Sequence, residues 1–557
     1  MSKSQKNSIR LAALFLLLLI PTLYAMHSAI DLEYSWLKKT AYLGAVVLLL
    51  LIPALFLKAR AYFIAEGVLN FLFFPIDIAS LYLNKQSTST AFLENILHTD
   101  IHEATELLLS IWPLCMIVVA LWVVYFVLAI RVDNRYLLTP LMRKIVWIGV
   151  PVAGALGVTV MTVYIKHLYP ERTLLSVPRD AISLTWIKFY KIYPYNLYIE
   201  SIDIIRKEQE QKHLQEQLAT FSFGIRRQES SAPAMYVLVI GEASRYDHWS
   251  INGYQRQTTP LLANLPNLIS YDSAFSQANL TQYSVPLIIT RATADNPYLA
   301  YAEKSLPEAF QEAGIKAGFL TTQIPSDLTN RIMNACDYSY FNHKGIDVEN
   351  NYDEQLVQQL SSFTTDSTQF FVLHSLGCHF RYELRYPQSF DIFQPTFGKS
   401  FSYLMVTEEN KDKLINAYDN AIAYTDYFLH QLITYIDDLN RPAVVLYMSD
   451  HGESFWDDDR KLSLHGSYQL SEYEYHVPLL VWYSDEFAAL KPDQVQALHN
   501  HRATPISSDV VFHTLLDLAD IREPMDSTRS LCSPYLVSPD SIFVHIGSGG
   551  TQWFHYK

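Results

Sequence analysis

The amino-acid sequence predicts a region of five transmembrane helices followed by a large α/β domain with a largely parallel central sheet. Half of the 557 residues are hydrophobic, and long apolar runs are concentrated before about Lys166. After Pro233 short β-branched or aromatic runs alternate with helical stretches, as in parallel α/β sheets. We therefore expect a transmembrane domain over residues 1–168, a bridge and linker helix over 169–232, and a globular domain over 233–557.

Five apolar stretches have about the length that a helix needs to cross ~30 Å of hydrocarbon. They are Leu11–Met26, Ala41–Leu57, Ala61–Leu83, Leu107–Ile130 and Ile145–Ile165. We do not expect the first to be a cleaved signal peptide, because another apolar span follows it directly.

Basic residues predict the orientation of these spans, because cytoplasmic loops are enriched in Lys and Arg. They gather before the first span, between the second and third, and between the fourth and fifth: Lys3, Lys6, Arg10, Lys58, Arg60, Arg131, Arg135, Arg143 and Lys144. The opposite loops hold mainly Lys38, Lys39 and Lys85. A cytoplasmic N-terminus and five spans place everything after Lys166 outside the cytoplasm.

Three segments outside the spans have patterns typical of membrane surfaces. Residues 84–106 have the period of an amphipathic helix on the outer face, and either a simple connector or a lipid-docking element fits this pattern. Residues 169–200 are rich in Tyr, Trp and Pro, which suits an interfacial bridge. Residues 201–218 are polar and favour a helix, which we interpret as a stalk.

Charge and cysteine content exclude two classes of protein. The net charge of −14 argues against nucleic acid as a partner, because phosphate-backbone binders need a basic footprint. Four cysteines are too few for a disulfide scaffold, and Cys336, Cys378 and Cys532 lack the spacing of a CxxC zinc site. We expect unpaired thiols or at most one bridge.

Polar clusters follow three apolar runs of the globular domain, Tyr236–Ile240, Phe370–Leu373 and Ala443–Met448. Ligands bind beyond the carboxyl ends of strands in α/β sheets, so these clusters can converge. Their carboxylates and imidazoles suit a divalent metal, and zinc is the ordinary choice for such ligands. The candidate ligands are Glu242, His374, His379, Asp450, His451, Glu453 and His465.

A nucleophile is available in the segment from Asn279 to Pro286. If a helix begins near Thr281, its free N–H groups can hold phosphoryl oxygens while a metal lowers the pKa of the hydroxyl. On chemistry alone, Ser276, Thr281 and Ser284 all remain candidates.

Six motifs occur in order: GEASRYDHWSINGYQRQTTPLL from Gly241, TQYSVP from Thr281, HSLGCHF from His374, AYDNAIAYTDYFL from Ala417, SDHGES from Ser449 and LHG from Leu464. With these motifs the chain resembles the lipopolysaccharide phosphoethanolamine transferases of the alkaline phosphatase and sulfatase superfamily. The resemblance covers nearly the whole chain, including the five spans and the outer loop. It implies a sulfatase-type catalytic domain in the periplasm, anchored in a bacterial inner membrane.

The resemblance also implies roles for particular residues. The first zinc site would comprise Glu242, Thr281, Asp450 and His451, with the Thr281 hydroxyl as nucleophile. His379 and His465 match ligands of the phosphoryl group or of a second zinc. His374 and Glu453 match residues that either contact the donor headgroup or are structural, and Asn95, Thr99 and Glu103 match positions linked to lipid binding.

The implied reaction transfers phosphoethanolamine from phosphatidylethanolamine to lipid A or the lipopolysaccharide core through a phospho-threonine. The resemblance also implies one tightly bound Zn²⁺, with room for a second. It implies a monomer in the bilayer as well. The sequence departs from the family in its cysteines. It also has Cys378 and Phe380 where an Asn and a Gly usually flank the second histidine. Between Leu320 and Cys336 the family pattern is missing, so the family's headgroup contacts cannot be assigned to residues there.

Other functions stay open beside this one. A glycerol-phosphate transferase of the lipoteichoic acid synthase type shares the five spans, the threonine and the metal chemistry. Transfer to a periplasmic glucan or protein, and a non-enzymatic scaffold on the same fold, are further alternatives. A sulfatase is disfavoured, because the segment around Thr281 lacks the CxPxR-like motif from which formylglycine is made.

Overall fold

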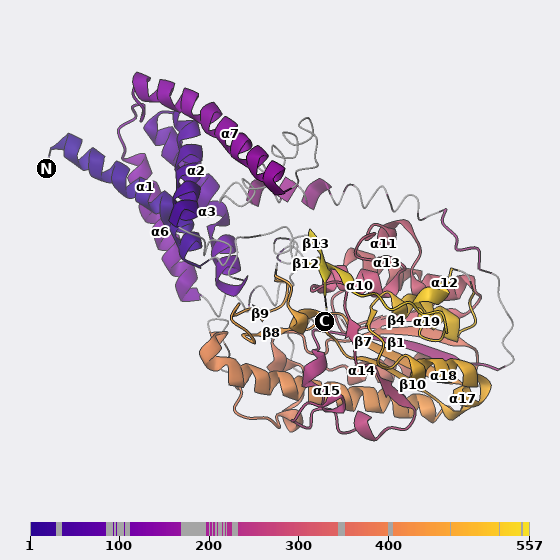
Figure 1. Ribbon diagram of the computed structural model, residues 1–557. Helices are drawn as coiled ribbons and strands as arrows, with labels where there is room; N and C mark the ends of the chain where they lie inside the picture. The colour runs from indigo at the N-terminus through magenta and orange to yellow at the C-terminus, as the bar shows by residue number, and fades with distance from the viewer. Residues whose placement is uncertain are drawn as a thin grey trace. The chain divides into compact units, whose positions relative to one another are not determined.

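The computed structural model describes residues 2–28, 36–84, 112–168, 232–342, 351–398, 405–467, 469–522, 524–546 and 550–555, with residue 401 and isolated residues or short runs within 88–105 and 197–225 (Figure 1). The chain forms two compact units. One comprises Met1–Glu94 and Ile111–Arg206, and the other comprises Asn95–Ser110 and Lys207–Lys557. Each unit is described by itself.

The N-terminal unit is built from long helices that each overlap one predicted apolar stretch. They are α1 (Lys3–Ser28), α2 (Trp36–Ala54), α3 (Ala59–Asn84), α6 (Trp112–Ile130) and α7 (Pro140–Leu168). By length and hydropathy, Lys3–Tyr24 and Pro140–Val160 could cross a membrane, whereas Tyr42–Ala54 and Cys115–Ile130 are shorter apolar stretches among the described residues. The number of spans therefore stays a prediction.

Aromatic packing holds α3 against α6. Tyr125 is fully buried, and its hydroxyl donates to the carbonyl of Phe63 at 2.7 Å. A Cβ on Gly67 would lie 2.4 Å from the Tyr125 ring, so glycine is required for this approach of the two helices. The predicted lipid-binding positions Asn95, Thr99 and Glu103 lie outside the described residues, as does most of the predicted bridge.

The globular unit is organised on a seven-stranded sheet with the order β2-β10-β7-β1-β6-β4-β5. Strands β7, β1, β6, β4 and β5 pair in parallel, while β10 is antiparallel to both β7 and β2. The prediction of a largely parallel sheet is confirmed. The strands are β1 (Met235–Gly241), β2 (Leu268–Ser270), β4 (Lys316–Thr321), β5 (Tyr338–Phe341), β6 (Gln369–His374), β7 (Ala443–Ser449) and β10 (Leu479–Tyr483).

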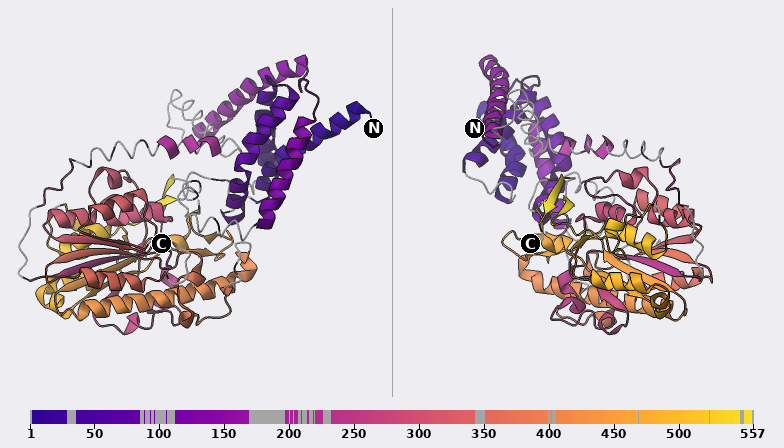
Figure 2. Two further views of the ribbon diagram at one scale, coloured as in Figure 1. Left: turned by 180° about the vertical axis from the view of Figure 1, so that it is seen from behind. Right: turned by 45° about the vertical axis from the view of Figure 1, so that its right-hand side comes forward.

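Helices cover both faces of this sheet, so the central strands are apolar on both sides (Figure 2). Alternate residues of β1 show this: Val237 and Val239 pack in one core, and Leu238 and Ile240 pack in the other. The first core contains residues of α14 (Glu354–Phe363) and α15 (Lys411–Asp437). The second contains residues of α10 (Thr281–Ile289), α12 (Leu306–Glu312), α13 (Asp327–Ala335), α17 (Asp485–Leu490), α18 (Pro492–Asn500) and α19 (Val510–Leu518).

Small two-stranded sheets and short helices complete the unit. The strand pairs are β3 (Ala274–Phe275) with β11 (Ile506–Ser507), β8 (Ser454–Phe455) with β9 (Ser463–Leu464), and β12 (Ile542–Ile546) with β13 (Gly550–Phe554). The short helices are α11 (Leu299–Ala302) and α16 (Glu472–Tyr475).

Cys115, Cys336, Cys378 and Cys532 are all unpaired. We expect thiol reduction to shift the thermal unfolding midpoint of the zinc-loaded full chain by no more than about 2 °C, because the fold does not depend on a disulfide for stability. Thermal scans in oxidising and reducing buffer at constant zinc measure this. A large drop on reduction would show that a cysteine pair is structural.

Candidate metal and nucleophile site

The candidate site lies at the carboxyl edge of the central strands β7, β1 and β6. Glu242 directly follows β1, His374 ends β6, and Asp450 follows β7. The register pairs Ile240 with His374 and Gly241 with Ser449, so all three chain segments leave the sheet at the same level. The predicted convergence of these clusters is confirmed.

Glu242, Asp450 and His451 form the first group of possible metal ligands. One ligand atom from each lies within 4.8 Å of the others, and all three side chains are completely buried. His451 Nε2 lies 3.4 Å from Glu242 Oε1 and 3.5 Å from Asp450 Oδ2.

Neighbouring polar groups orient these three side chains. His451 Nδ1 lies 2.8 Å from the carbonyl of Gly452, so Nδ1 carries a proton, and Nε2 is the ring nitrogen that faces the carboxylates and would bind a cation. The Oδ1 atom of Asp450 accepts from the backbone N–H groups of Ala243 at 3.0 Å and His451 at 2.7 Å. Gln323 Nε2 donates to Glu242 Oε2 at 2.9 Å.

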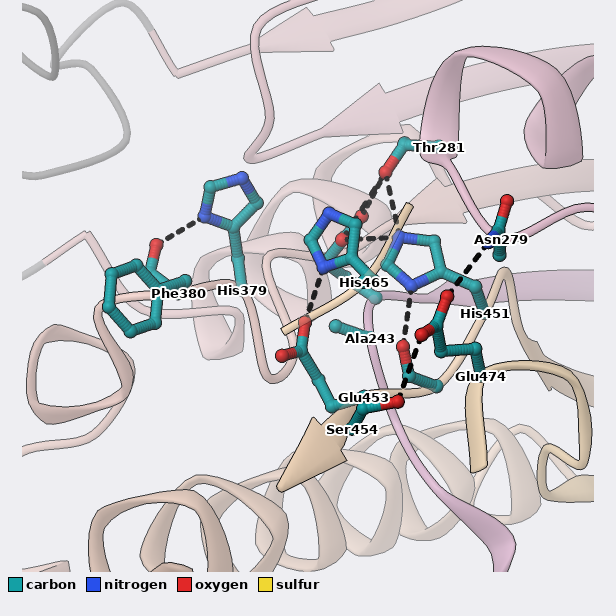
Figure 3. Close-up of polar contacts among 12 residues, drawn as sticks. Ala243, Asn279, Thr281, His379, Phe380, His451, Glu453, Ser454, His465 and Glu474 are labelled. Carbon is teal, nitrogen blue, oxygen red and sulfur yellow. Dashed lines mark hydrogen bonds and ion pairs between the residues drawn. The ribbon is translucent and has the colours of Figure 1, made fainter. Parts of the chain in front are cut away.

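Thr281 supplies the hydroxyl that faces this group (Figure 3). It is the first residue of α10, and its Oγ1 lies 3.2 and 3.3 Å from the two carboxylate oxygens of Glu242 and 3.3 Å from His451 Nε2. The other hydroxyls are completely buried: Ser276 hydrogen-bonds the carbonyl of Asp450, and Ser284 donates to the carbonyl of Leu280 at 3.1 Å. Only Thr281 among the three is partly exposed, and the geometry favours it as the nucleophile.

The electrostatics of this group favour a bound cation. Burial, and next the charge of Glu242, raise the pKa of Asp450. Although burial favours the neutral imidazole, Asp450 and Glu242 raise the pKa of His451 to about 10. Two buried carboxylates thus face one imidazole, and a divalent cation would neutralise them. The donor set of two carboxylates, one imidazole nitrogen and one hydroxyl fits Zn²⁺.

His451, Glu453 and His465 form a second group, with one ligand atom from each within 4.8 Å of the others. Glu453 Oε1 pairs with His465 Nδ1, and its Oε2 accepts from the Tyr382 hydroxyl at 2.8 Å. The rings of His451 and His465 lie 4.2 Å apart between centroids. Glu453 therefore orients His465 and leaves its Nε2 available to a ligand.

The remaining two histidines lie outside both groups. His379 Nδ1 lies 2.5 Å from the carbonyl of Phe380, and its role in holding a phosphoryl group or a second zinc stays a prediction (Figure 3). His374 is 4% exposed, and burial lowers its pKa to about 4, so it is neutral at pH 7. Its contact with a headgroup stays a prediction as well.

Asp353 anchors the loop between these histidines. Its Oδ1 accepts from Leu376 N–H at 2.8 Å, and its Oδ2 accepts from Gly377 N–H at 2.9 Å. Gly377 has φ +46°, and a Cβ there would lie 2.9 Å from the backbone nitrogen of Glu242. Glycine is therefore required where this loop passes the first group.

Sequence reasoning missed Gln323, Tyr382 and Asp353. A signal existed only for Gln323, which follows a run of strand-forming residues, Lys316–Thr321, next to β6 in the sheet. Tyr382 and Asp353 come from segments with no pattern that points to the site.

Two family models match the chain. The model described as Sulfatase matches residues 234–521, which is more than half of the 557 residues. The model described as Phosphoethanolamine transferase EptA/EptB matches residues 88–169.

Three curated relatives carry related names. Over 305 residues the chain is 30% identical to phosphoethanolamine transferase EptA of Helicobacter pylori, a match of 52% of this chain and 54% of that one. It is 25% identical over 504 residues to phosphoethanolamine transferase EptC of Escherichia coli, with coverages of 86% and 84%. Over 262 residues it is 31% identical to the Kdo(2)-lipid A phosphoethanolamine 7''-transferase of E. coli, with coverages of 45% and 44%. It thus spans about half the length of the first and third relatives.

Two solved structures have the same fold. The periplasmic domain of E. coli EptC, in complex with Zn, is 25% identical and has a TM-score of 0.53, covering 60% of this chain and 95% of that one. The integral membrane protein EptA of Neisseria meningitidis is 20% identical with a TM-score of 0.67, covering 92% and 97%. The second likeness concerns the fold alone.

The mostly parallel sheet and the family match over residues 234–521 define the globular unit as a sulfatase-type α/β domain. The chain belongs to the sulfatase family. Its resemblance to the phosphoethanolamine transferases is confirmed by the match at residues 88–169 and by the named relatives.

Proposed function

We propose that this chain is a zinc-dependent phosphoethanolamine transferase that uses Thr281 as its nucleophile. The observation that carries the proposal is the Thr281 hydroxyl, which lies 3.2 Å from Glu242 and 3.3 Å from His451 at the start of α10. The names of the relatives support phosphoethanolamine as the transferred group, and one of them acts on Kdo(2)-lipid A. The Zn complex of a structural relative supports the choice of metal.

In the first step, Thr281 Oγ1 attacks the phosphorus of phosphatidylethanolamine. The P–O bond to diacylglycerol breaks, the proton that Thr281 loses ends on the diacylglycerol oxygen, and phosphoethanolamine becomes bonded to Thr281. The Glu242 carboxylate orients the Thr281 hydroxyl, because its oxygens lie 3.2 and 3.3 Å from Oγ1. Held by Glu242, Asp450 and His451, zinc would supply Lewis acidity and lower the pKa of the attacking hydroxyl.

In the second step, an acceptor oxygen attacks the same phosphorus, the bond to Thr281 breaks, and Thr281 Oγ1 takes up the proton that the acceptor loses. The N-terminus of α10 favours the negative charge of the phosphoryl oxygens in both steps. The rings of His465 and His451 lie 4.2 Å apart between centroids, and we propose that His465 Nε2 binds a phosphoryl oxygen or the leaving group. We propose lipid A or the lipopolysaccharide core as acceptor, and phosphatidylethanolamine as donor.

We also propose that the chain lies in a bacterial inner membrane as a monomer, with its catalytic domain in the periplasm. The distribution of basic residues and the similarity to an integral membrane protein support this location. We expect alkaline phosphatase fused after Lys557 to be active in cells. If a reporter that works only in the cytoplasm were active when fused after Lys557, the proposed orientation of the chain would be contradicted.

Mass spectrometry of envelope glycolipids tests the function directly. We expect lipid A or core fragments from cells that contain the protein to carry added phosphoethanolamine, and those from cells without it to lack this group. Assays of the purified chain with either phosphatidylethanolamine or phosphatidylglycerol as donor distinguish transfer of phosphoethanolamine from transfer of glycerol phosphate. Transfer of glycerol phosphate alone, or modification of only a glucan or protein, would contradict the proposal.

A further inference from the structure

Glu474 is a completely buried carboxylate that belongs to neither group of possible metal ligands. It lies in the short helix α16, after the loop that carries His465. We propose that Glu474 is a positioning residue, which holds the Thr281 loop in register with the loops that carry Glu453 and His465. The role of these loops in transfer rests on the function proposed above, whereas the contacts of Glu474 do not.

The first contact of Glu474 is with the loop that precedes Thr281. Asn279 Nδ2 donates to Glu474 Oε2 at 2.8 Å, and the same amide donates to the carbonyl of Ser467 at 2.8 Å (Figure 3). Asn279 is completely buried and lies two residues before Thr281. One amide thereby joins the start of α10 to the segment that follows His465.

Three further contacts reach the other loops. Ser467 N–H donates to Glu474 Oε2 at 3.2 Å, and the Ser454 hydroxyl donates to Oε1 at 2.9 Å. The backbone carbonyl of Glu474 accepts from Gly452 N–H at 2.8 Å. Each contacted residue lies within two positions of His451, Glu453 or His465, so this side chain and its carbonyl connect all three loops.

The chemistry of these contacts requires an oxygen acceptor at this position. Burial raises the pKa of Glu474 to about 7, while Asn279, Ser454 and Ser467 stabilise the carboxylate. An alanine would leave buried donors unsatisfied. A glutamine keeps an oxygen for Asn279 and Ser467, and its amide can donate to the Ser454 hydroxyl. Hydrogen bonding rather than charge is therefore the feature that the loops need.

The consequence for the reaction is geometric. Thr281 Oγ1 lies 3.2–3.3 Å from its partners in the first group, and a shift of about 1 Å in its loop would misplace the attacking atom. Misplacement of this size costs about 100-fold in rate. Because the hydrogen bonds of the Glu474 side chain go to Asn279, Ser454 and Ser467 rather than to the proposed metal ligands, its loss should affect turnover rather than metal binding.

Steady-state kinetics on the zinc-loaded full chain test the proposal. We expect Glu474→Ala to lower kcat about 10- to 100-fold, with KM and zinc content within about twofold of wild type. We expect Glu474→Gln to stay within about threefold of wild type. Asp426→Ala is the matched control, because Asp426 is also buried and accepts two backbone N–H groups, of Leu261 and Leu262, in a loop outside the site.

A double-mutant cycle with Asn279→Ala identifies the route of the effect. If Glu474 acts through Asn279, the double variant should be no slower than the slower single variant. If Glu474→Ala does not fold, Asn279→Ala alone should show the fall in kcat at unchanged KM. Three results would overturn the proposal. They are a wild-type kcat in Asn279→Ala, an equal fall in kcat in Glu474→Gln and Glu474→Ala, and the same fall in kcat in Asp426→Ala.

Two readouts separate this proposal from the proposed function. Hydrolysis of a chromogenic phosphodiester measures the Thr281 site without the lipid donor, so failure to use phosphatidylethanolamine leaves the Glu474 comparison intact. Hydrogen exchange needs no activity: we expect faster amide exchange at residues 279–282 and 465–467 in Glu474→Ala, and not in Asp426→Ala. Unchanged exchange in those segments would contradict the positioning role.

Discussion

Replacing Thr281 by alanine is expected to lower the rate of phosphoethanolamine transfer by at least about 10⁴-fold, as removal of a nucleophile does in other covalent mechanisms. The variant should keep its fold and its zinc, because Glu242, Asp450 and His451 remain and are oriented by Gly452, Ala243 and Gln323. Donor turnover and zinc content, measured on the same preparation, check both parts. Wild-type chain given donor without acceptor should show a phosphoethanolamine adduct at Thr281.

Two further variants, one that introduces a serine and one that removes a serine, serve as controls for this result. Thr281→Ser keeps the hydroxyl and should retain partial activity. Ser284→Ala should retain most activity, because the buried Ser284 hydroxyl donates to the carbonyl of Leu280 at 3.1 Å and has only a longer contact, 3.4 Å, with Asp450 Oδ2. If Thr281→Ala transferred the group at near the wild-type rate, the nucleophile would have to be another hydroxyl.

Removal of zinc is expected to abolish transfer and to lower the thermal unfolding midpoint. A ligand that binds only the folded state at 1,000 times its Kd stabilises that state by ~4 kcal/mol, which corresponds to a shift of roughly 10 °C in a domain of this size. Without the cation, Glu242 and Asp450 also face each other as buried carboxylates, and this raises the pKa of Asp450. Calorimetry and activity before and after chelation, and after zinc is restored, measure both effects.

Asp450→Asn is the test variant for the metal, and Asp426→Asn is its control. Both aspartates are buried and accept backbone N–H groups, but only Asp450 lies beside Glu242 and His451. We expect Asp450→Asn to lose zinc and the zinc-dependent part of its stability. An equal loss of zinc in both variants, or full activity of the chelated enzyme, would contradict the proposed site.

The sheet and the first group could be predicted because local pattern and global topology agree there. Tyr236–Ile240 and Ala443–Met448 are uninterrupted apolar runs, and Glu242 and Asp450 each follow one residue later; parallel strands bring such endings to one edge. Thr281 could be selected only with the resemblance, since Ser276 and Ser284 offer the same chemistry. The structure separates them by exposure and by the partners of their hydroxyls.

The supporting side chains could not be predicted because their roles exist only in tertiary contacts. Tyr382 and Glu474 follow no periodic pattern, and Gln323 has only the strand before it as a signal. Each contacts a residue or loop of the site that is distant in sequence.

The order of strands in the sheet has a consequence for how the protein matures. The hydrogen bond from Ala243 N–H to Asp450 joins residues 207 positions apart, and Glu474 contacts the site from still further along the chain. In the orientation proposed above, a site with such sequence separation cannot form on the emerging polypeptide until most of the chain has crossed the membrane. The proposed zinc would then be bound late, in the compartment where translocation ends. The metal supply of that compartment, together with ligand geometry, would decide which ion the new protein receives.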